Sequence, residues 1–243
     1  MNRILLEPGE IKDGVATFGG ARAAHVVGVL HGEAGQTLKT GEIGGLNGTS
    51  EILSIDSGGA DGPLVTVRVS HAEVPLPSWA DLILAPPRPR AMKRLLPQLA
   101  TLGVGRIVLV GAQKVEKDFW GATLLKEANW RPLLVEGLMQ AGTGVLPTVE
   151  TRRSFRRFVR DELDALFPTA NRIVAHPYGQ CDGSGGVASP AGRPLLAVGP
   201  EGGWTDGEVA LLEEHGFRRM SLGQRILRTD TAVIALLSRI GAE

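Results

Sequence analysis

The chain has 243 residues, 43% of them hydrophobic, and its 26 basic side chains balance 26 acidic ones. Such a chain can bury one large core or two smaller ones, which excludes a disordered protein. No basic-then-apolar leader and no apolar run of membrane-spanning length are visible, so we expect a cytoplasmic protein with no membrane contact.

The charge is unevenly distributed along the chain. Residues 1–75 hold 5 Lys/Arg against 9 Asp/Glu, whereas residues 86–160 hold 14 against 5. The middle of the chain is therefore the part that would contact negatively charged groups.

The first 75 residues predict a β-rich N-terminal domain. Short apolar or alternating runs are separated by glycine-rich turns such as TGEIGGLNG, and the runs lie at 4–6, 23–30, 52–55 and 64–69. This spacing is typical of a small barrel of short strands. The stretch VPLPSWADLILAPPRPR then carries five of the 15 prolines and indicates a linker around one strand at 81–85. We therefore expect a barrel domain at 1–75 and a second domain at 80–243.

Beyond the linker, apolar runs typical of strands alternate with segments of helical period. The runs lie at 106–110, 171–175, 195–198 and 217–222. This alternation predicts an α/β fold with a mostly parallel sheet and helices on its faces. Ligands of such sheets bind at the carboxyl ends of the strands, and two unusual loops follow strands here.

The first loop, GPEGGW, follows the third of these runs. Gly199 can adopt backbone angles closed to other residues, and Gly202 and Gly203 have no side chain to keep a ligand from the main chain. Thr205 and Glu208 have the spacing of a capping box, so we expect a helix to begin there with its dipole directed at the loop. From this loop alone, a tight turn without a ligand is an equally good interpretation.

The second loop, LGQRILRTDTA, places Arg225, Arg228 and Asp230 beside the apolar pair Ile226 and Leu227, an unusual mixture for a surface turn. A helix with an apolar stripe follows. Arg228 fits a ligand or phosphate role at a helix start, and the alternative is a structural clamp on a neighbouring carboxylate.

These two motifs, GPEGGWTDGEV from residue 199 and LGQRILRTDTA from residue 222, resemble the signature of the RsmE family. Its members are bacterial enzymes that methylate N3 of a uridine in 16S small-subunit ribosomal RNA. The stretches HVVGVLHGEAGQTLKTGE, TLGV at 101–104 and HP at 176–177 are similar to further parts of that family. The resemblance implies a PUA-like β-barrel followed by a SPOUT domain with a C-terminal trefoil knot. It also implies S-adenosylmethionine as methyl donor, ribosomal RNA or the small ribosomal subunit as partner, and a homodimer.

With that chemistry, the two loops predict site residues. The predicted cofactor contacts are His176, Gly199, Gly202, Gly203, Leu222, Gly223, Ile226 and Leu227. Arg228 would stabilise the negative charge that develops on the uracil ring as N3 loses its proton. Glu201 or Asp230 would receive that proton or position Arg228, and the sequence does not separate these roles.

A basic segment predicts where RNA would bind. In RRSFRRFVRDELDALF, helical projection places five arginines within roughly 140° of arc, with apolar side chains on the other side. Guanidinium groups pair with phosphate oxygens in a fixed fork, and a merely solvated helix face is the alternative. The stretch PRPRAMKR would extend this track, and the predicted RNA contacts are Arg88, Arg90, Lys93, Arg94, Arg152, Arg156 and Arg160.

Other chemistries lack their motifs. The chain has no GxxxxGK[ST] phosphate loop, and no cysteine or carboxylate spacing predicts a metal site. We interpret Cys181 as an incidental loop thiol and DGSGG at 182–186 as a flexible loop. Two alternatives stay open: a methyltransferase acting on a different RNA, and an RNA-binding or ribosome-assembly protein of the same fold without methyl transfer. The second is open because Gln98 and Thr101 depart from the residues usual in the family.

Overall fold

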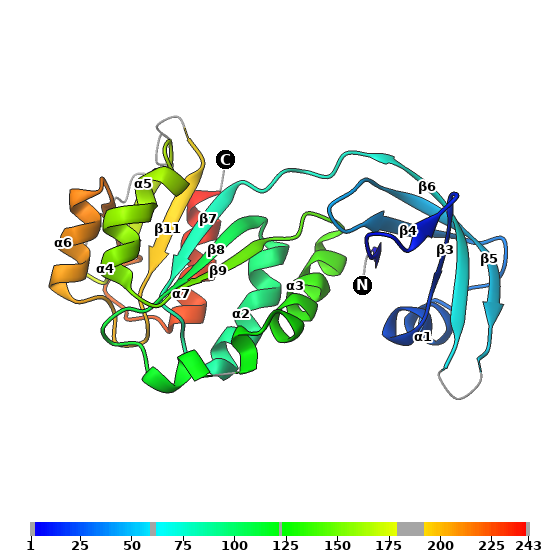
Figure 1. Ribbon diagram of the computed structural model, residues 1–243, viewed down its shortest axis with the longest axis horizontal. Helices are drawn as coiled ribbons and strands as arrows, with labels where there is room; N and C mark the ends of the chain where they lie inside the picture. The colour runs from blue at the N-terminus through cyan, green and yellow to red at the C-terminus, as the bar shows by residue number, and fades with distance from the viewer. Residues whose placement is uncertain (1–2, 59–61, 122, 179–191, 242–243) are drawn as a thin grey trace. The chain divides into compact units, whose positions relative to one another are not determined.

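A computed structural model describes residues 3–58, 62–121, 123–178 and 192–241 (Figure 1). The predicted loop thiol Cys181 and the DGSGG loop at 182–186 lie outside these residues. The chain forms two compact units. Unit 1 comprises Met1–Pro77 and Val135–Leu146, and unit 2 comprises Ser78–Leu134 and Pro147–Glu243.

The described part of unit 1 is built on one curled, barrel-like sheet, as the spacing of the short runs predicts. Strand β1 pairs with β4 in parallel, and the other neighbouring pairs are antiparallel. In their order across the sheet, the strands are β1 (Ile4–Leu6), β4 (Thr37–Glu42), β5 (Asn47–Asp56), β6 (Leu64–Glu73), β3 (Val15–Phe18) and β2 (Ile11–Lys12).

One predicted strand of unit 1 is a helix. The run at 23–30, which the apolar pattern assigns to the barrel strands, lies mostly in helix α1 (Gly20–Gly28). Ala23 and Val26 are fully buried in the same core as Phe18, whereas the two residues between them are not buried. A spacing of three is that of one helix face, and the three alanines of this segment favour a helix over a strand.

Residues 135–146 lie far along the chain but pack within unit 1. The amide of Arg3 donates a hydrogen bond to the carbonyl of Met139 at 3.1 Å, and the amide of Gly44 donates to the carbonyl of Gly144 at 2.8 Å. Local periodicity in the sequence carries no signal for such a distant pairing. The division into domains at 1–75 and 80–243 stays a prediction.

Unit 2 contains a parallel sheet, as the alternation of strand and helix patterns predicts. In spatial order, its strands are β12 (Arg218–Met220), β10 (Asn171–Ala175), β11 (Pro194–Val198), β7 (Ala80–Leu84), β8 (Val104–Val110) and β9 (Thr148–Arg152). Strand β7 comes first along the chain but lies in the interior of the sheet, because later strands are added on both of its sides. Such a reversal of strand order is where α/β sheets form ligand sites.

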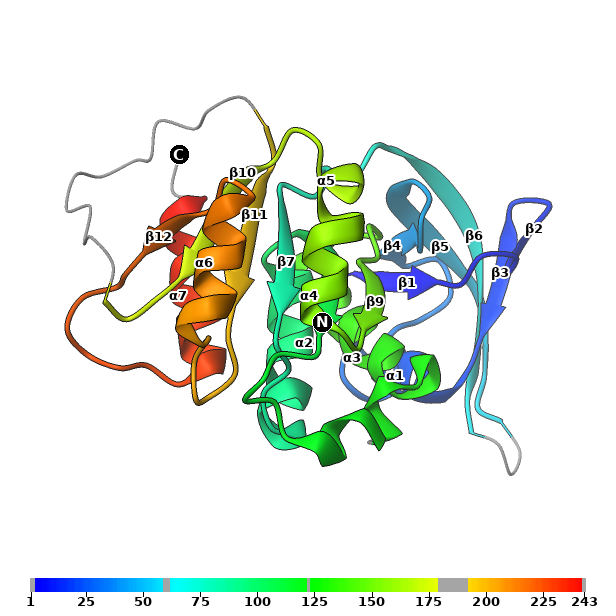
Figure 2. The same ribbon diagram turned by 60° about the vertical axis from the view of Figure 1, so that its left-hand side comes forward.

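Helices cover both faces of this sheet (Figures 1 and 2). Helices α2 (Pro89–Thr101) and α7 (Thr229–Ile240) pack side by side on one face. Helices α4 (Phe155–Arg157), α5 (Leu163–Leu166) and α6 (Asp206–Glu214) lie on the other. The central strands are accordingly almost continuously buried, as expected for a parallel sheet covered on both sides. The remaining helical segments are η1 (Lys117–Gly121), η2 (Thr123–Leu125) and α3 (Glu127–Ala141).

The predicted arginine helix begins later than its pattern indicates. Arg152 is the last residue of β9, where it pairs with Val110 of β8. Ser154 caps the helix, because its Oγ accepts a hydrogen bond from the amide of Arg157 at 3.3 Å. The helical segment then runs through α4 (Phe155–Arg157), a π-helical stretch (Phe158–Glu162) and α5 (Leu163–Leu166). Strand pairing and the serine cap thus remove Arg152 and Arg153 from the helix.

Candidate functional site

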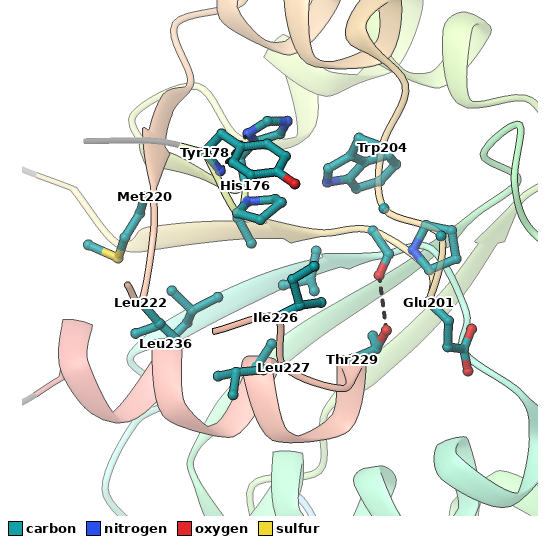
Figure 3. A pocket seen from close by; sticks show the side chains of 18 of the residues that line it. His176, Tyr178, Glu201, Trp204, Met220, Leu222, Ile226, Leu227, Thr229 and Leu236 are labelled. Atoms are coloured by element: carbon teal, nitrogen blue, oxygen red, sulfur yellow. Dashed lines mark hydrogen bonds between the residues drawn. The ribbon is translucent and has the colours of Figure 1, made fainter. Parts of the chain in front are cut away.

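A pocket of about 410 Å³ lies at the carboxyl ends of β10, β11 and β12 in unit 2 (Figure 3). Its walls come mainly from the segments that follow these strands and from the start of α7. This is the edge of the sheet at which ligands of parallel sheets bind. Among the eight predicted cofactor contacts, those that line it are His176, Gly199, Gly202, Gly203, Leu222, Ile226 and Leu227, and Gly223 does not.

The backbone of the GPEGGW loop requires two of its glycines, Gly199 and Gly203. Gly203 has a φ of +67°, in the left-handed region, and its amide donates to the carbonyl of Pro200 at 2.8 Å, which closes a tight turn. A Cβ atom at Gly199 would lie 2.9 Å from the amide nitrogen of Trp204. The loop therefore needs glycine for its own conformation. Because glycine has no side chain, the main chain of the loop is also open to the pocket.

The capping box that the sequence predicts after this loop is confirmed. The amide of Thr205 donates to Glu208 Oε2 at 2.8 Å, and the amide of Glu208 donates to Thr205 Oγ1 at 3.4 Å. The buried Glu208 also accepts a hydrogen bond from the amide of Gln113 at 2.8 Å, which ties the start of α6 to the loop after β8. The positive end of the α6 dipole thus adjoins the GPEGGW loop.

The second loop is anchored on both sides, because the residues at 221 and 229 donate hydrogen bonds to the segments that follow β10 and β11. The hydroxyl of Thr229 donates to the carbonyl of Gly199 at 3.5 Å, and that of Ser221 donates to the carbonyl of Pro177 at 3.1 Å. Between these anchors, Ile226 is 77% exposed and lies over the pocket (Figure 3). An exposed isoleucine at the mouth of a pocket is typical of a surface that a ligand covers.

His176 faces the pocket as a neutral imidazole. Its Nδ1 accepts a hydrogen bond from the amide of Tyr178 at 3.2 Å, so the ring proton is on Nε2. Burial lowers the pKa of His176, and the charge of Arg219 lowers it further. A neutral ring with a proton on Nε2 can donate a hydrogen bond into the pocket but cannot accept a proton there.

The two predicted proton acceptors are both engaged with other residues. Glu201 lines the pocket, and its Oε1 accepts a hydrogen bond from the amide of Arg88 at 3.0 Å. Asp230 does not line the pocket, and its Oδ2 accepts a hydrogen bond from Arg94 at 2.7 Å. This hydrogen bond is the main reason why the pKa of Asp230 lies below its usual range, which makes Asp230 a weak base.

Arg228, the predicted anion-stabilising residue, lies at the rim rather than in the wall of the pocket. It is the N-cap residue of α7, and its side chain is 77% exposed. Its Nε lies 3.9 Å from Asp230 Oδ1. Its chain neighbours Leu227 and Thr229 both line the pocket, so Arg228 can reach a substrate that approaches the pocket from solvent.

Sequence reasoning missed many of the residues that line the pocket, and Lys114 and Trp204 are two of them. Lys114, from the loop after β8, donates a hydrogen bond from its ammonium group to the carbonyl of Gly202 at 2.7 Å. Trp204 is buried, its ring lies 5.1 Å from that of Phe155, and its Nε1 has no hydrogen-bond partner among the described residues. Lys114 follows a parallel strand, so the rule that ligands bind at the carboxyl ends of strands would have found it. Trp204 directly follows the glycines of the GPEGGW motif, and this position is the signal that could have found it.

The predicted RNA contacts fall into two groups on opposite faces of the sheet. Arg88, Arg90, Lys93 and Arg94 lie at the start of α2, and Arg156 and Arg160 lie on the α4–α5 segment. Arg152 belongs to neither group. Its guanidinium donates to Glu162 at 2.6 Å and to Glu150 at 2.8 Å, so it is a structural residue of β9.

The described residues contain no helix that is both long and apolar enough to cross a membrane. Within the same residues, no three His, Cys, Asp or Glu side chains form a group that could hold a metal ion.

The fold and the pocket define a class of protein. A family model described as an RNA methyltransferase domain matches residues 74–241, which include every strand of the unit 2 sheet and both pocket loops. The class is thus that of the α/β RNA methyltransferases.

Relatives narrow this class to one family. The ribosomal RNA small subunit methyltransferase E of Treponema pallidum is 30% identical to this chain, over 97% of this chain and 88% of the relative. The protein of the same name from Synechocystis is 26% identical, over 99% of this chain and 77% of the relative. The chain belongs to the RsmE family of RNA methyltransferases, the family that its two loops resemble.

Solved structures share the fold. A Legionella pneumophila methyltransferase in complex with S-adenosylmethionine is 26% identical with a TM-score of 0.73, covering 98% of this chain and 96% of the other. The ribosomal RNA small subunit methyltransferase E of Neisseria gonorrhoeae, bound to S-adenosylmethionine, is 22% identical with a TM-score of 0.74, covering 98% and 95%. Both match the whole architecture, including the barrel-like sheet.

Proposed function

We propose that this protein transfers a methyl group from S-adenosylmethionine to N3 of a uridine in 16S small-subunit ribosomal RNA. The observation that carries the proposal is the pocket formed by the two loops that also carry the family signature. Family membership and the names of the relatives support the reaction, and the structures that contain S-adenosylmethionine support the methyl donor.

The pocket fits this cofactor in size and chemistry. Its volume of about 410 Å³ lies within the range of roughly 300–1,000 Å³ that small-molecule sites usually have. Leu222, Ile226 and Leu227 offer apolar surface for an adenine ring, and the bare main chain of the GPEGGW loop offers hydrogen bonds. When bound, S-adenosylmethionine would supply an electrophilic methyl group.

Trp204 lines the pocket, and its indole Nε1 is a buried donor without a hydrogen-bond partner among the described residues. A buried donor without a partner costs free energy, of the order of 1–3 kcal/mol, unless a ligand or water satisfies it. His176 offers another donor through Nε2, as its hydrogen bond to Tyr178 dictates. The pocket thus combines apolar walls with a few directed donors, which suits a nucleoside with polar ends.

The protein's own task would be to hold the uracil in line with the methyl group and to favour loss of the N3 proton. Arg228 would stabilise the charge that spreads over the uracil oxygens, since its guanidinium is exposed beside the pocket. Glu201 lines the pocket and would accept the proton or hold the water that does. Arg90 and Lys93 on α2 would bind the RNA backbone near this rim.

Several further expectations belong to the same proposal. The family resemblance supports a homodimer, and the exposed Ile226 and Tyr178 offer apolar surface that a second subunit or the substrate would cover. Action on ribosomal RNA supports a cytoplasmic location. The trefoil knot in unit 2 also remains a prediction from the family.

The test is mass spectrometry of 16S ribosomal RNA from a strain that lacks this protein. We expect one N3-methyluridine to disappear and to return when the wild-type protein is restored. Retention of every methylated uridine in the deletion strain would contradict the proposal. Saturable binding of S-adenosylmethionine without turnover on any ribosomal RNA would instead favour a binding or assembly protein of the same fold.

A further inference from the structure

Both predicted proton acceptors are bound by the same helix, α2. Glu201, from the GPEGGW loop, accepts a hydrogen bond from the amide of Arg88, which directly precedes α2, at 3.0 Å. Asp230, from the first turn of α7, accepts a hydrogen bond from Arg94 in α2 at 2.7 Å. One carboxylate therefore joins the GPEGGW loop to the start of α2, and another joins α7 to α2.

The hydrogen bond from Arg94 is the largest cause that keeps the pKa of Asp230 below its usual range. The side chain of Asp230 is 16% exposed, whereas that of Arg94 is 55% exposed. For a partly buried carboxylate, a charged partner and hydrogen bonds favour the ionised form. Its Oδ1 accepts a hydrogen bond from the amide of Thr231 at 3.1 Å, and the nearest atom of Arg228 in their ion pair lies 3.9 Å away. Among the described residues, Arg94 therefore makes the closest charged contact to Asp230, and Arg228 makes the second.

Arg94 differs in this respect from the basic residues beside it. Arg90 and Lys93 are exposed, and within the described residues neither side chain has a hydrogen bond or an ion pair. Their charges are available to phosphate groups. The guanidinium of Arg94 points to a different helix, 136 positions further along the chain, and is already used there.

The first turn of α7 connects Asp230 to the pocket. Thr229, the preceding residue, lines the pocket and donates its hydroxyl hydrogen to the carbonyl of Gly199. Arg228, one residue earlier, is the N-cap of the same helix. A shift of Asp230 would therefore move the backbone that carries Arg228 relative to the GPEGGW loop.

We propose that Arg94 is a positioning residue for methyl transfer, because its hold on Asp230 fixes the first turn of α7 and thereby the guanidinium of Arg228. The inference rests on the proposed function and refines it. On this inference, Arg94 is not an RNA contact and Asp230 is not a proton acceptor.

The test compares Arg94→Gln with Arg90→Gln, which removes the same charge from the same helix without breaking the contact to Asp230. We expect Arg94→Gln to lower kcat about 10- to 100-fold, as small misplacements of reacting groups do. The salt dependence of RNA binding should stay as in the wild type. Arg90→Gln should instead raise the KM for RNA and reduce the salt slope by about one unit.

A second measurement separates positioning from loss of fold. Adding Asp230→Asn to Arg94→Gln removes the unpaired carboxylate, so the double variant should recover part of the lost kcat, a coupling that unrelated sites do not show. Thermal unfolding of each variant provides the control for folding. If Arg94→Gln reduces the salt slope as Arg90→Gln does and keeps its kcat, then Arg94 is an RNA contact and the inference is wrong.

An activity-independent measurement distinguishes this inference from the proposed function. The side-chain carboxyl of Asp230 can be titrated by carbon NMR in the intact protein, and its midpoint should rise in Arg94→Gln and stay unchanged in Arg90→Gln. A wild-type protein that methylates no ribosomal RNA would overturn the proposed function. An unchanged midpoint in Arg94→Gln would overturn the hold of Arg94 on Asp230, whatever the activity.

Discussion

Lys114 and Gly202 join two loops that lie 88 positions apart in the sequence. The ammonium group of Lys114 donates a hydrogen bond to the carbonyl oxygen of Gly202 at 2.7 Å. A Cβ atom at Gly202 would also lie 3.0 Å from Cδ of Lys114, so the lysine stem packs against the GPEGGW loop. The loop after β8 thus supports the backbone that forms one wall of the pocket.

We expect Lys114→Met to weaken the binding of S-adenosylmethionine about threefold to tenfold. The substitution removes one charge-assisted hydrogen bond, worth about 1 kcal/mol where solvent screens it, and leaves the loop less ordered. Isothermal titration calorimetry measures the change. Lys117→Met is the matched control, since Lys117 is exposed in the same segment and does not line the pocket. Equal affinities for the two variants would show that the Lys114 contact does not support the pocket.

Gly203 provides a test of the pocket itself. We expect Gly203→Val to abolish cofactor binding, because its φ of +67° disfavours a branched side chain and the loop backbone would have to shift. The strain is about 1–2 kcal/mol, so the fold should survive. Gly216→Val is the control: Gly216 has a φ of +80° and lies outside the pocket. Calorimetry that finds wild-type affinity in Gly203→Val would place the cofactor elsewhere.

Arg152 should behave as a structural residue rather than as an RNA contact. Its guanidinium joins Glu150 and Glu162, and its side chain is 27% exposed. We expect Arg152→Gln to lower the free energy of unfolding by about 1–3 kcal/mol, because Glu162 loses its partner and Glu150 keeps only Arg106, at 3.6 Å. RNA affinity should not change. Arg156→Gln, at an exposed position on the adjoining helix, should change stability by less than about 0.5 kcal/mol.

Denaturant unfolding and RNA-binding titrations of both variants decide this point. A stable Arg152→Gln protein with weakened RNA binding would restore the sequence-based role of Arg152. Weaker RNA binding in Arg156→Gln, with a reduced salt slope, would identify the α4–α5 face as an RNA surface; an unchanged slope would mean that this face is only solvated.

Cofactor binding should depend on the ionisation of His176. Burial and the charge of Arg219 lower its pKa, while Asp206 and Glu213 oppose this effect. The folded protein therefore keeps His176 neutral at pH values where an unfolded histidine, with a pKa near 6.5, is already protonated. We expect cofactor affinity to be constant above pH 6.5 and to fall only at lower pH, when protonation of Nδ1 breaks the hydrogen bond from Tyr178.

The same shift affects stability. Since the unfolded chain binds the proton more tightly, the contribution of His176 to stability is complete above pH 6.5 and is lost as the pH falls through and below that value. Calorimetric titrations between pH 5 and 8 should therefore show a loss of affinity on the acidic side that is absent in His176→Asn. A similar loss in both proteins would assign the pH dependence to another group.

The sequence predicts those features whose signals are local. Unbroken apolar runs identify the buried parallel strands, and the spacing of Thr205 and Glu208 is sufficient to predict a capping box. The segment 23–30 is predicted as a strand because a short apolar run fits both periods, although the alanines of α1 favour a helix and its buried residues pack against the curled sheet with helical spacing.

Contacts between distant segments lie beyond such signals. The ion pair of Arg94 with Asp230 joins residues 136 positions apart, and no periodic pattern links them. Sequence reasoning therefore assigned Arg94 to RNA because of its charge, and Asp230 to proton transfer because of its motif. The structure shows that Arg94 and Asp230 bind each other. The position of Lys114 after a parallel strand is a usable signal, but its contact with the backbone carbonyl of Gly202 leaves no pattern in the sequence.

Arg228 remains the central prediction for the chemistry. Loss of the N3 proton leaves negative charge over the uracil oxygens, and a guanidinium at a helix start is suited to stabilise it as it develops. Arg228 is exposed at the N-cap of α7, between two residues that line the pocket, so its side chain can move onto a bound base.

We expect Arg228→Lys to keep the positive charge but to lose the planar fork, which should lower the single-turnover rate about tenfold to hundredfold. The affinity for S-adenosylmethionine should change by less than about twofold, because the side chain does not line the pocket. Rapid-quench methylation and calorimetry on the same preparations measure the two quantities separately. A variant that methylates at the wild-type rate while cofactor binding collapses would make Arg228 a cofactor or structural residue. The stabilising role would then pass to another cation, and Arg225, which lines the pocket, is the nearest along the chain.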